Sequence, residues 1–329
     1  MNPICVIHDA TEEKCRQQIW RVLPHSIRAC ILEAGISLRT MQEIRIRINA
    51  PLLCVAGGTE YLLPCRSRPH IISRQELDET MEYVSQYSLY AFEQEMRQGF
   101  ITIEGGHRVG LGGKVLAEAG QVRSMTHISS LNLRIAHAVA GCAEPLLPYI
   151  AEEGKVLHTL LIAPPRCGKT TVLRDLIRLV SNGNYYIKGS TVGVVDERSE
   201  LGGCWQGVPQ NDLGMRTDLL DCCPKAEGML MLIRSMAPQV IAVDEIGAAE
   251  DVHAIEYAMH CGCKMLASVH GSSLEEIRKK PYLEKLVAQH RFERYVILGS
   301  EPHAGTILEV LNTEGNTLTG KRRGDSGCI

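Results

Sequence analysis

The amino-acid sequence predicts an α/β protein, with a largely parallel sheet in its second half and a smaller α+β domain in its first half. In the second half, short apolar runs alternate with segments of helical periodicity, as in buried parallel strands joined by crossover helices. In the first half, alternating and glycine-punctuated strand patterns are mixed with helical ones. Because 329 residues suit two domains, we expect an N-terminal domain with its connector over 1–145 and a second domain over 146–329.

Strands and one long helix are expected in the first half. Residues 38–58 (LRTMQEIRIRINAPLLCVAGG) alternate apolar and basic side chains and end in a Gly-Gly turn, which predicts a half-buried strand. Residues 73–99 have helical spacing and begin with Ser73, a suitable N-cap. The glycine-punctuated segment 100–116 predicts β structure, and the passage 134–154 predicts a helix and a connector.

The second half alternates strands and helices in a regular order. Strands are predicted at 158–164, 190–196, 239–245, 263–269, 292–299 and 305–311, and helices at 170–183, 228–236, 249–262 and 272–280. In open α/β sheets the ligand site lies at the carboxyl ends of the strands. The residues that follow each predicted strand are therefore the candidates for function.

Composition and charge limit the classes of function that the chain can have. A formal net charge of −3 and only 3 Phe and 2 Trp give no sign of a nucleic-acid surface. The N-terminus has no secretory signal pattern, and no run of roughly 18 apolar residues predicts a membrane span. We therefore expect a cytoplasmic protein that is peripheral wherever it meets a membrane. The 13 cysteines are odd in number and include no C-x-x-C pair, which favours reduced, buried thiols and no zinc site.

The string APPRCGKT at 163–170 follows a strand and opens a helix, as a phosphate-binding loop does. It departs from the usual pattern because Ala163 replaces the first glycine and two prolines follow. Phosphate is bound mainly by N–H groups late in such a loop, so these early changes remove no essential donor. Alanine is tolerated at 163 provided that its φ is negative. The residues predicted to surround the phosphates of ATP are Pro165, Arg166, Cys167, Gly168, Lys169, Thr170 and Thr171.

Within this loop Gly168 lets the backbone approach phosphate, Lys169 reaches the β- and γ-phosphates, and the Thr170 hydroxyl binds Mg²⁺. A second strand, QVIAVDEIG, ends in two adjacent acids. Asp244 is predicted to support Mg²⁺ through its water shell, and Glu245 to polarise the attacking water. Both cofactors, ATP and Mg²⁺, follow from this pair of motifs.

Three further groups have two interpretations each. The strand VGVVD ends in Asp196 and Glu197, which belong either to the site or to a solvated strand end. His270 ends another strand, either as a group that contacts the γ-phosphate or its water or as a satisfied polar residue. The arginines on this edge are either surface residues or fingers that act across a subunit boundary. These arginines are Arg198, Arg216 and Arg234.

Four elements therefore occur in one order: the phosphate loop (163–170), an acidic box (196–200), the Asp-Glu strand end (244–245) and a histidine box (268–271). This order resembles the secretion-ATPase superfamily of type II and type IV systems and pilus motors. Within it, the strings LLIAPPRCGKTT, VGVVDERSE and SVHG are most similar to the stage III sporulation protein AA family. The resemblance extends into 43–52, 105–115 and 127–143, and covers the chain apart from its extreme N-terminus and the tail after about residue 315.

The resemblance implies a RecA-like ATPase core with a smaller N-terminal domain, assembled as a hexameric ring. It implies a place on the mother-cell face of the membrane, docked on membrane proteins of the channel that links mother cell and forespore. By position it makes Glu245 the catalytic acid and places Asp196 and Glu197 in the acidic box. It makes His270 the histidine-box residue and Arg134 a candidate interdomain arginine. The tetracysteine zinc site of many type II relatives has no counterpart in these spacings.

The leading hypothesis is an ATP-hydrolysing ring motor, with Glu245, His270 and Glu197 as its catalytic residues. One alternative is a nucleic-acid-dependent RecA-like ATPase, which Arg45, Arg47, Arg108 and the basic run Lys321-Arg322-Arg323 keep open. Another is a nucleotide-gated assembly protein with negligible turnover.

Overall fold

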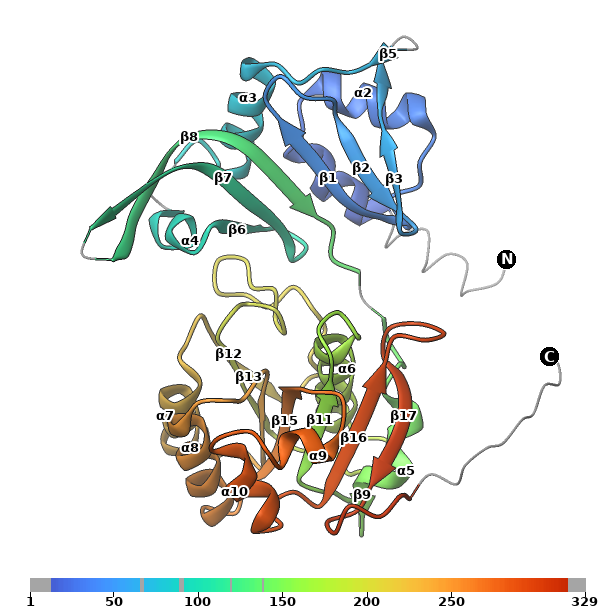
Figure 1. The fold of residues 1–329 in the computed structure, drawn as a ribbon, viewed down its shortest axis with the longest axis vertical. Helices are drawn as coiled ribbons and strands as arrows, with labels where there is room; N and C mark the ends of the chain where they lie inside the picture. Colours follow the sequence, from blue (N-terminus) through green and yellow to red (C-terminus); the bar gives the residue numbers. More distant parts are fainter. Residues whose placement is uncertain (1–12, 66–67, 89–91, 119, 138, 319–329) are drawn as a thin grey trace, which may run out of the picture. The chain divides into compact units, whose positions relative to one another are not determined.

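The computed structural model describes residues 13–65, 68–88, 92–118, 120–137 and 139–318. These residues form two compact units (Figure 1). The first unit contains the described residues up to His137 together with Gly203–Gln210, and the second contains 139–202 and the described residues from Asn211 onward. The segment Gly203–Gln210 is thus part of the first unit, although its neighbours along the chain are part of the second.

The first unit is built on a six-stranded antiparallel sheet with the order β3-β2-β1-β8-β7-β6. Its strands are β1 (Met41–Arg47), β2 (Leu53–Ala56), β3 (Thr59–Leu62), β6 (Phe100–Ile103), β7 (His107–Glu118) and β8 (Gln121–Arg134), and a small pair, β4 (Pro64–Cys65) and β5 (Arg68–Pro69), lies beside it. Its helices include α2 (His25–Ala34), α3 (Arg74–Val84) and α4 (Glu93–Gln98), and residues 13–21 are also helical. In β1, Ile44 and Ile46 are fully buried while Arg47 is exposed, so the half-buried strand is confirmed.

Two helix predictions in this half are wrong in extent. Ser73 does cap α3, where its hydroxyl accepts the N–H of Glu76. The helix ends at Val84, however, and Gln86 and Tyr87 take left-handed φ values of 49° and 61° that a helix cannot continue. The passage 134–154 holds only a 3₁₀ turn (Glu144–Leu146) and α5 (Leu147–Ile150), because its prolines remove the backbone donors that a longer helix needs.

The second unit contains a seven-stranded sheet with the order β13-β12-β14-β15-β11-β16-β17, in which all neighbours are parallel except β16 and β17. The strands are β11 (Thr159–Ala163), β12 (Val192–Asp196), β13 (Thr217–Asp221), β14 (Val240–Val243), β15 (Lys264–His270), β16 (Arg294–Gly299) and β17 (Thr306–Leu311). The helices are α6 (Lys169–Asn182), α7 (Lys225–Ser235), α8 (Ala249–His260), α9 (Leu274–Ile277) and α10 (Leu283–Ala288), and a short pair, β9 (Ala151–Glu152) and β10 (Lys155–Val156), precedes β11. The predicted α/β class with a largely parallel sheet is confirmed.

Helices cover both faces of this sheet. Leu161 of β11 packs in the same core cluster as the apolar face of α6, whereas Leu160 and Ile162 pack in the cluster that holds α8. This division follows from the alternation of side chains along a strand. Strand β13 was not predicted, because its sequence TDLLD is short, carries two aspartates and is only partly buried. Within the described ranges, no helix is long and apolar enough to cross a membrane.

Candidate active site

The phosphate loop starts at the end of the central strand β11. Ala163 is the last strand residue, its carbonyl accepts the N–H of Gly271 at 3.1 Å, and it lies in register with His270 of β15. Its φ is not positive, so the backbone condition under which alanine is tolerated here is met. Because the first loop position continues a strand, nothing in the local backbone requires glycine there.

The turn itself depends on two residues with left-handed backbone, Arg166 (φ 63°) and Gly168 (φ 74°). A Cβ on Gly168 would lie 2.6 Å from the backbone nitrogen of Gly305, which is too close for any side chain. Gly305 in turn donates its N–H to the Cys167 carbonyl at 2.9 Å, and the Cys167 side chain is buried in the core. The segment after β16 therefore supports the phosphate loop from one side.

Lys169 begins α6 and is almost completely buried, with 5% of its side chain exposed. Its Nζ lies 3.1 Å from Glu245 Oε1, 3.9 Å from Asp244 Oδ1 and 3.5 Å from His270 Nδ1. The structure therefore brings together the loop lysine, both acids of the Asp-Glu strand end and the strand-end histidine. Their strands are parallel neighbours or near neighbours, so their carboxyl ends meet at one edge of the sheet.

Asp244 is fixed by two hydroxyl groups. Thr170 Oγ1 donates to its Oδ2 at 2.7 Å, and Ser268 Oγ donates to its Oδ1. The Ser268 oxygen also accepts the backbone N–H of Glu245 at 2.9 Å, so one buried hydroxyl orients both acids. The sequence analysis did not identify Ser268. The sequence indicates Ser268 only as a hydroxyl side chain inside an apolar strand. A hydroxyl buried in this way needs a hydrogen-bond partner.

Glu245 is surrounded by positive charge. His270 Nε2 lies 2.8 Å from its Oε1, and Arg198 donates to its Oε2 at 2.7 Å. Burial by itself raises the pKa of this carboxyl, but the hydrogen bond and charge of Lys169 and the charges of His270 and Arg198 outweigh it, so the pKa lies below its ordinary value. Glu245 is therefore ionised at neutral pH, as a water-polarising carboxylate must be.

The two acids of the acidic box after β12, Asp196 and Glu197, have different surroundings. Asp196 is buried and accepts the backbone N–H groups of Glu200 and Gly202, both at 2.8 Å. Burial raises the pKa of Asp196 to about 6, against these hydrogen bonds. Glu197 instead forms an ion pair with Lys225 at the start of α7, and lines one small pocket with Asp244 and Glu245.

Arg174 connects α6 to the acidic box and was not identified from the sequence. Its guanidinium donates to the carbonyl oxygens of Glu200 at 2.6 Å and Leu201 at 3.0 Å. Asn211 Nδ2 also donates to the Leu201 carbonyl, at 2.9 Å. The base of the loop that leaves the second unit after Gly202 is thus fixed to the helix that carries Lys169.

The remaining predicted arginines lie in different places. Arg216 donates to the carbonyl oxygens of Ser181 and Asn182, at the opposite end of α6 from the phosphate loop. Arg234 is exposed in the last turn of α7. Arg134 ends β8 of the first unit, 3.9 Å from Glu43. A role for any of these three arginines across a subunit boundary stays a prediction. The basic run Lys321-Arg322-Arg323 lies outside the described residues.

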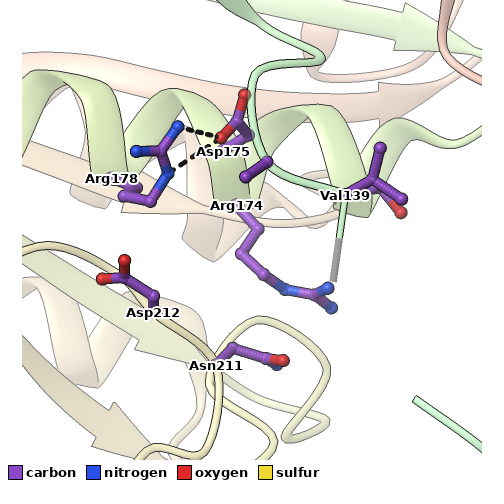
Figure 2. Close-up of a pocket in the computed structure, with 8 residues that line it drawn as sticks. Val139, Arg174, Asp175, Arg178, Asn211 and Asp212 are labelled. Carbon is purple, nitrogen blue, oxygen red and sulfur yellow. Dashed lines mark hydrogen bonds and ion pairs between the residues drawn. The ribbon is translucent and has the colours of Figure 1, made fainter. Parts of the chain in front are cut away.

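A pocket of about 90 Å³ lies beside the first turns of α6. Figure 2 shows Arg178 turned toward Asp175, to which it donates two hydrogen bonds of 2.7 and 2.9 Å. Asp175 also accepts the N–H of Ala143 at 2.8 Å, so its buried charge is compensated. The pocket is lined by Val139, Ala140, Thr171, Arg174, Asp175, Arg178, Asn211 and Asp212. The pocket thus includes Thr171, the residue that follows the Mg²⁺-binding candidate Thr170.

Two solved structures share this fold. The ATPase DotB of Legionella pneumophila superposes with a TM-score of 0.57 and 14% identity, over 89% of this chain and 82% of that one. The pilus retraction motor PilT with bound ADP superposes with a TM-score of 0.51 and 13% identity, over 81% and 76% of the two chains. At such low identity the comparison shows the fold alone, and it is the RecA-like P-loop core predicted from the sequence.

Sequence comparisons are more specific. "Uncharacterized protein ycf45" of Porphyra purpurea is 24% identical over 87% of this chain and 45% of its own length. Stage III sporulation protein AA of Bacillus subtilis (strain 168) is 42% identical over 303 residues, which are 92% of this chain and 97% of that protein. The family model "Sporulation stage III, protein AA" matches residues 13–318. Because this match spans both units and their site residues, the chain belongs to the sporulation stage III protein AA family.

Proposed function

We propose that this chain is a Mg²⁺-dependent ATPase of the secretion type, which energises assembly of, or transport through, the channel between mother cell and forespore. The observation that carries the proposal is the convergence of Lys169, Asp244, Glu245 and His270 at one edge of the parallel sheet. Phosphoryl transfer needs a positioned cation, a metal-binding carboxylate and an oriented water. These side chains suit all three functions, and the Lys169 ammonium lies within 3.9 Å of each of the other three.

The residues at the start of α6 suit ATP and Mg²⁺. Asp244 and Thr170 present hard oxygen ligands side by side, which is the donor set that Mg²⁺ prefers. Lys169 and the backbone N–H groups of the loop would hold the β- and γ-phosphates, with bound Mg²⁺ neutralising their charge. The pocket beside Thr171 would receive the nucleoside end of ATP.

The Lys169 ammonium and the His270 ring both contact Glu245 Oε1. For Glu245 to polarise water, Lys169 must turn from the carboxylate to the phosphates, which carry more negative charge. His270 can then hold Glu245 or the attacking water in place. Glu197, paired with Lys225 in the same pocket, would act on the ligand only after leaving this partner.

The assembly proposed is a homo-oligomeric ring, a hexamer by resemblance to the secretion ATPases, on the mother-cell face of the membrane. Its partners would be membrane proteins of the same channel. The resemblance to the family supports these statements, and the exposed Arg234 and Arg134 remain candidates for contacts across subunits.

The test is the rate of phosphate release from ATP as a function of protein concentration, with Mg²⁺ or with EDTA, and with or without the channel's membrane proteins. A site completed by a neighbouring subunit predicts a specific activity that rises with protein concentration. A constant specific activity would contradict the ring mechanism. Tight ATP binding without phosphate release under every condition would instead support the nucleotide-gated assembly protein.

A further inference from the structure

The solvent face of the first unit's sheet contains a groove of about 320 Å³. The groove crosses β1, β8 and β7 in two adjacent rows, Arg45–Asn132–Gly110 and Arg47–Ser130–Gly112. Ile44, Ile46 and Leu133 alternate with these residues and are buried in the core. Since successive side chains of a strand point to opposite faces, the side chains of the two rows point away from the core.

The floor of the groove is open because β7 carries glycine in both rows. At Gly112 a Cβ would lie 2.2 Å from Ser130 Oγ, so packing explains this glycine. At Gly110 a Cβ would meet nothing closer than 3.8 Å, and the φ of Gly110 is not positive. Glycine destabilises the interior of a strand relative to alanine, and inside a strand it often marks the close approach of a ligand or another backbone. Neither packing nor backbone conformation accounts for Gly110, whereas an occupant of the groove does.

The walls of the groove are positively charged. Arg45 and Arg47 line it, and no acidic side chain does so among the described residues. Glu43 pairs with Arg45 at 2.7 Å, which offsets one charge and fixes the guanidinium at the wall. Arginine guanidinium groups bind carboxylates through paired hydrogen bonds. The charge of the groove is therefore complementary to an acidic ligand.

We propose that this groove binds an extended acidic segment of a partner polypeptide. No lining residue is aromatic, so the groove offers no stacking platform for nucleic-acid bases. Asn132 donates an Nδ2–H group to Glu43 at 3.4 Å and lines the groove between Arg45 and Gly110. With two guanidinium groups and no aromatic side chain, the lining suits the carboxylates of an acidic peptide. The proposal does not depend on nucleotide turnover.

The probe is a fluorescein-labelled peptide of alternating glutamate and serine, and its binding to the full chain is followed by anisotropy. We expect it to bind more tightly than the matching glutamine–serine peptide, with an affinity that falls as salt rises. The double variant Arg45→Gln/Arg47→Gln should weaken binding about tenfold or more, because it removes both charge-assisted guanidinium contacts. Gly110→Val should weaken binding to a similar degree without any change of charge.

The matched control is Arg123→Gln, which removes one charge from the same sheet. Arg123 pairs with Glu118 and precedes Ser130 by about 23 Å along β8, so binding should not change. The unfolding temperature of each variant, compared with that of the parent chain, separates loss of binding from loss of folding. If Gly110→Val lowers the unfolding temperature, Gly110→Ala places a smaller side chain on the groove floor and is used in its place.

Three results would overturn the proposal. The first is equal affinity for the glutamate and glutamine peptides. The second is a loss of binding in Arg123→Gln as large as in the arginine double variant. The third is tighter binding, through Arg45 and Arg47, of a single-stranded DNA oligonucleotide or of phosphatidylglycerol vesicles than of the acidic peptide. ATP binding measured on the same variants should be unchanged, so failure here is distinguishable from failure of the ATPase assignment.

Discussion

Arg198 donates a 2.7 Å hydrogen bond to Glu245 Oε2, while Lys169 and His270 contact the other oxygen of the same carboxylate. Both oxygens of the proposed catalytic acid are therefore engaged. Lys169 has phosphate to turn to during the reaction, whereas the Arg198 guanidinium holds the second carboxylate oxygen of Glu245. Arg198 thus restrains Glu245 within the chain, whatever it contacts in an assembly.

We predict that Arg198→Gln raises the basal rate of ATP hydrolysis of the isolated protein. Releasing Oε2 lets Glu245 orient water, and relief of about 1.4 kcal/mol of pairing energy corresponds to about a tenfold rise. The measurement is phosphate release at fixed protein and saturating ATP. A fall of roughly a hundredfold or more would show the opposite, that Arg198 serves as an arginine finger.

Lys169→Ala should abolish ATP binding. The buried ammonium is the positive charge that would meet the β- and γ-phosphates, and without it Asp244 and Glu245 would repel them. Equilibrium binding of a fluorescent ATP analogue measures this, with Lys155→Ala, an exposed lysine of β10, as the matched control. Intact binding and hydrolysis in Lys169→Ala would refute the assignment of the phosphate loop.

Glu245→Gln should keep ATP binding and lose turnover by roughly a hundredfold or more, because the amide keeps the shape of the side chain but cannot polarise water as a carboxylate does. Single-turnover hydrolysis and ATP affinity are measured together. Glu250→Gln, in the exposed first turn of α8, is the control. An equal loss of affinity and rate would mean that Glu245 binds the ligand instead of acting on water.

Ser268→Ala should lower both stability and turnover. It removes the donor to Asp244 and the acceptor for the Glu245 N–H, and a buried group left unpaired costs about 1–3 kcal/mol. Ser268→Thr, which keeps the hydroxyl, should recover part of the rate. If Ser268→Ala lowered only the unfolding temperature, with kcat unchanged, the hydroxyl would support the fold without positioning the acids.

Asp196 predicts a specific pH dependence of stability. Its pKa in the folded state is about 6, raised mainly by burial above the ordinary value of 3.8. Between these two values the folded state binds more protons than the unfolded state, so the free energy of unfolding falls as pH rises from about 4 to about 6. The two pKa values differ by about 2, which corresponds to ~3 kcal/mol.

Asp196→Asn should remove this decline. Scanning calorimetry from pH 4 to pH 7 without Mg²⁺ or nucleotide compares the two proteins, and their difference cancels the contribution of the other acids. Both tryptophans, Trp20 and Trp205, are in the first unit, so tryptophan fluorescence reports on that unit and calorimetry is the measurement used here. Parallel stability curves for the two proteins would contradict a raised pKa at Asp196.

Much of the second unit could be predicted from the sequence. The alternation of apolar runs and helical patterns gave the parallel sheet, and the carboxyl-end rule then placed Lys169, Asp244 and His270 together. Each of these residues follows a buried strand, so local patterns were enough. The edge strand β13 lacks such a pattern, and its identity as a strand depends on pairing with β12.

The rest of the site depends on contacts between residues far apart in the sequence. Ser268 orients Asp244 only because β15 lies beside β14. Arg174 donates to the carbonyl groups of Glu200 and Leu201 only when α6 packs beside the acidic box. A single sequence shows the residue types but not these distances. The pairing of Arg198 with Glu245 is of the same kind.

The segment Gly203–Gln210 has a consequence for the order in which the chain can fold during synthesis. Asn211 donates its N–H to the Gly202 carbonyl at 3.0 Å, so the segment leaves and re-enters the second unit at one point. In the first unit, Gln210 Oε1 accepts the N–H of Gly105 at 3.0 Å. The first unit is therefore incomplete until Gln210 has emerged from the ribosome, when β11, α6 and β12 have already been made. The two units cannot fold strictly one after the other, and no single cut in the gene separates them.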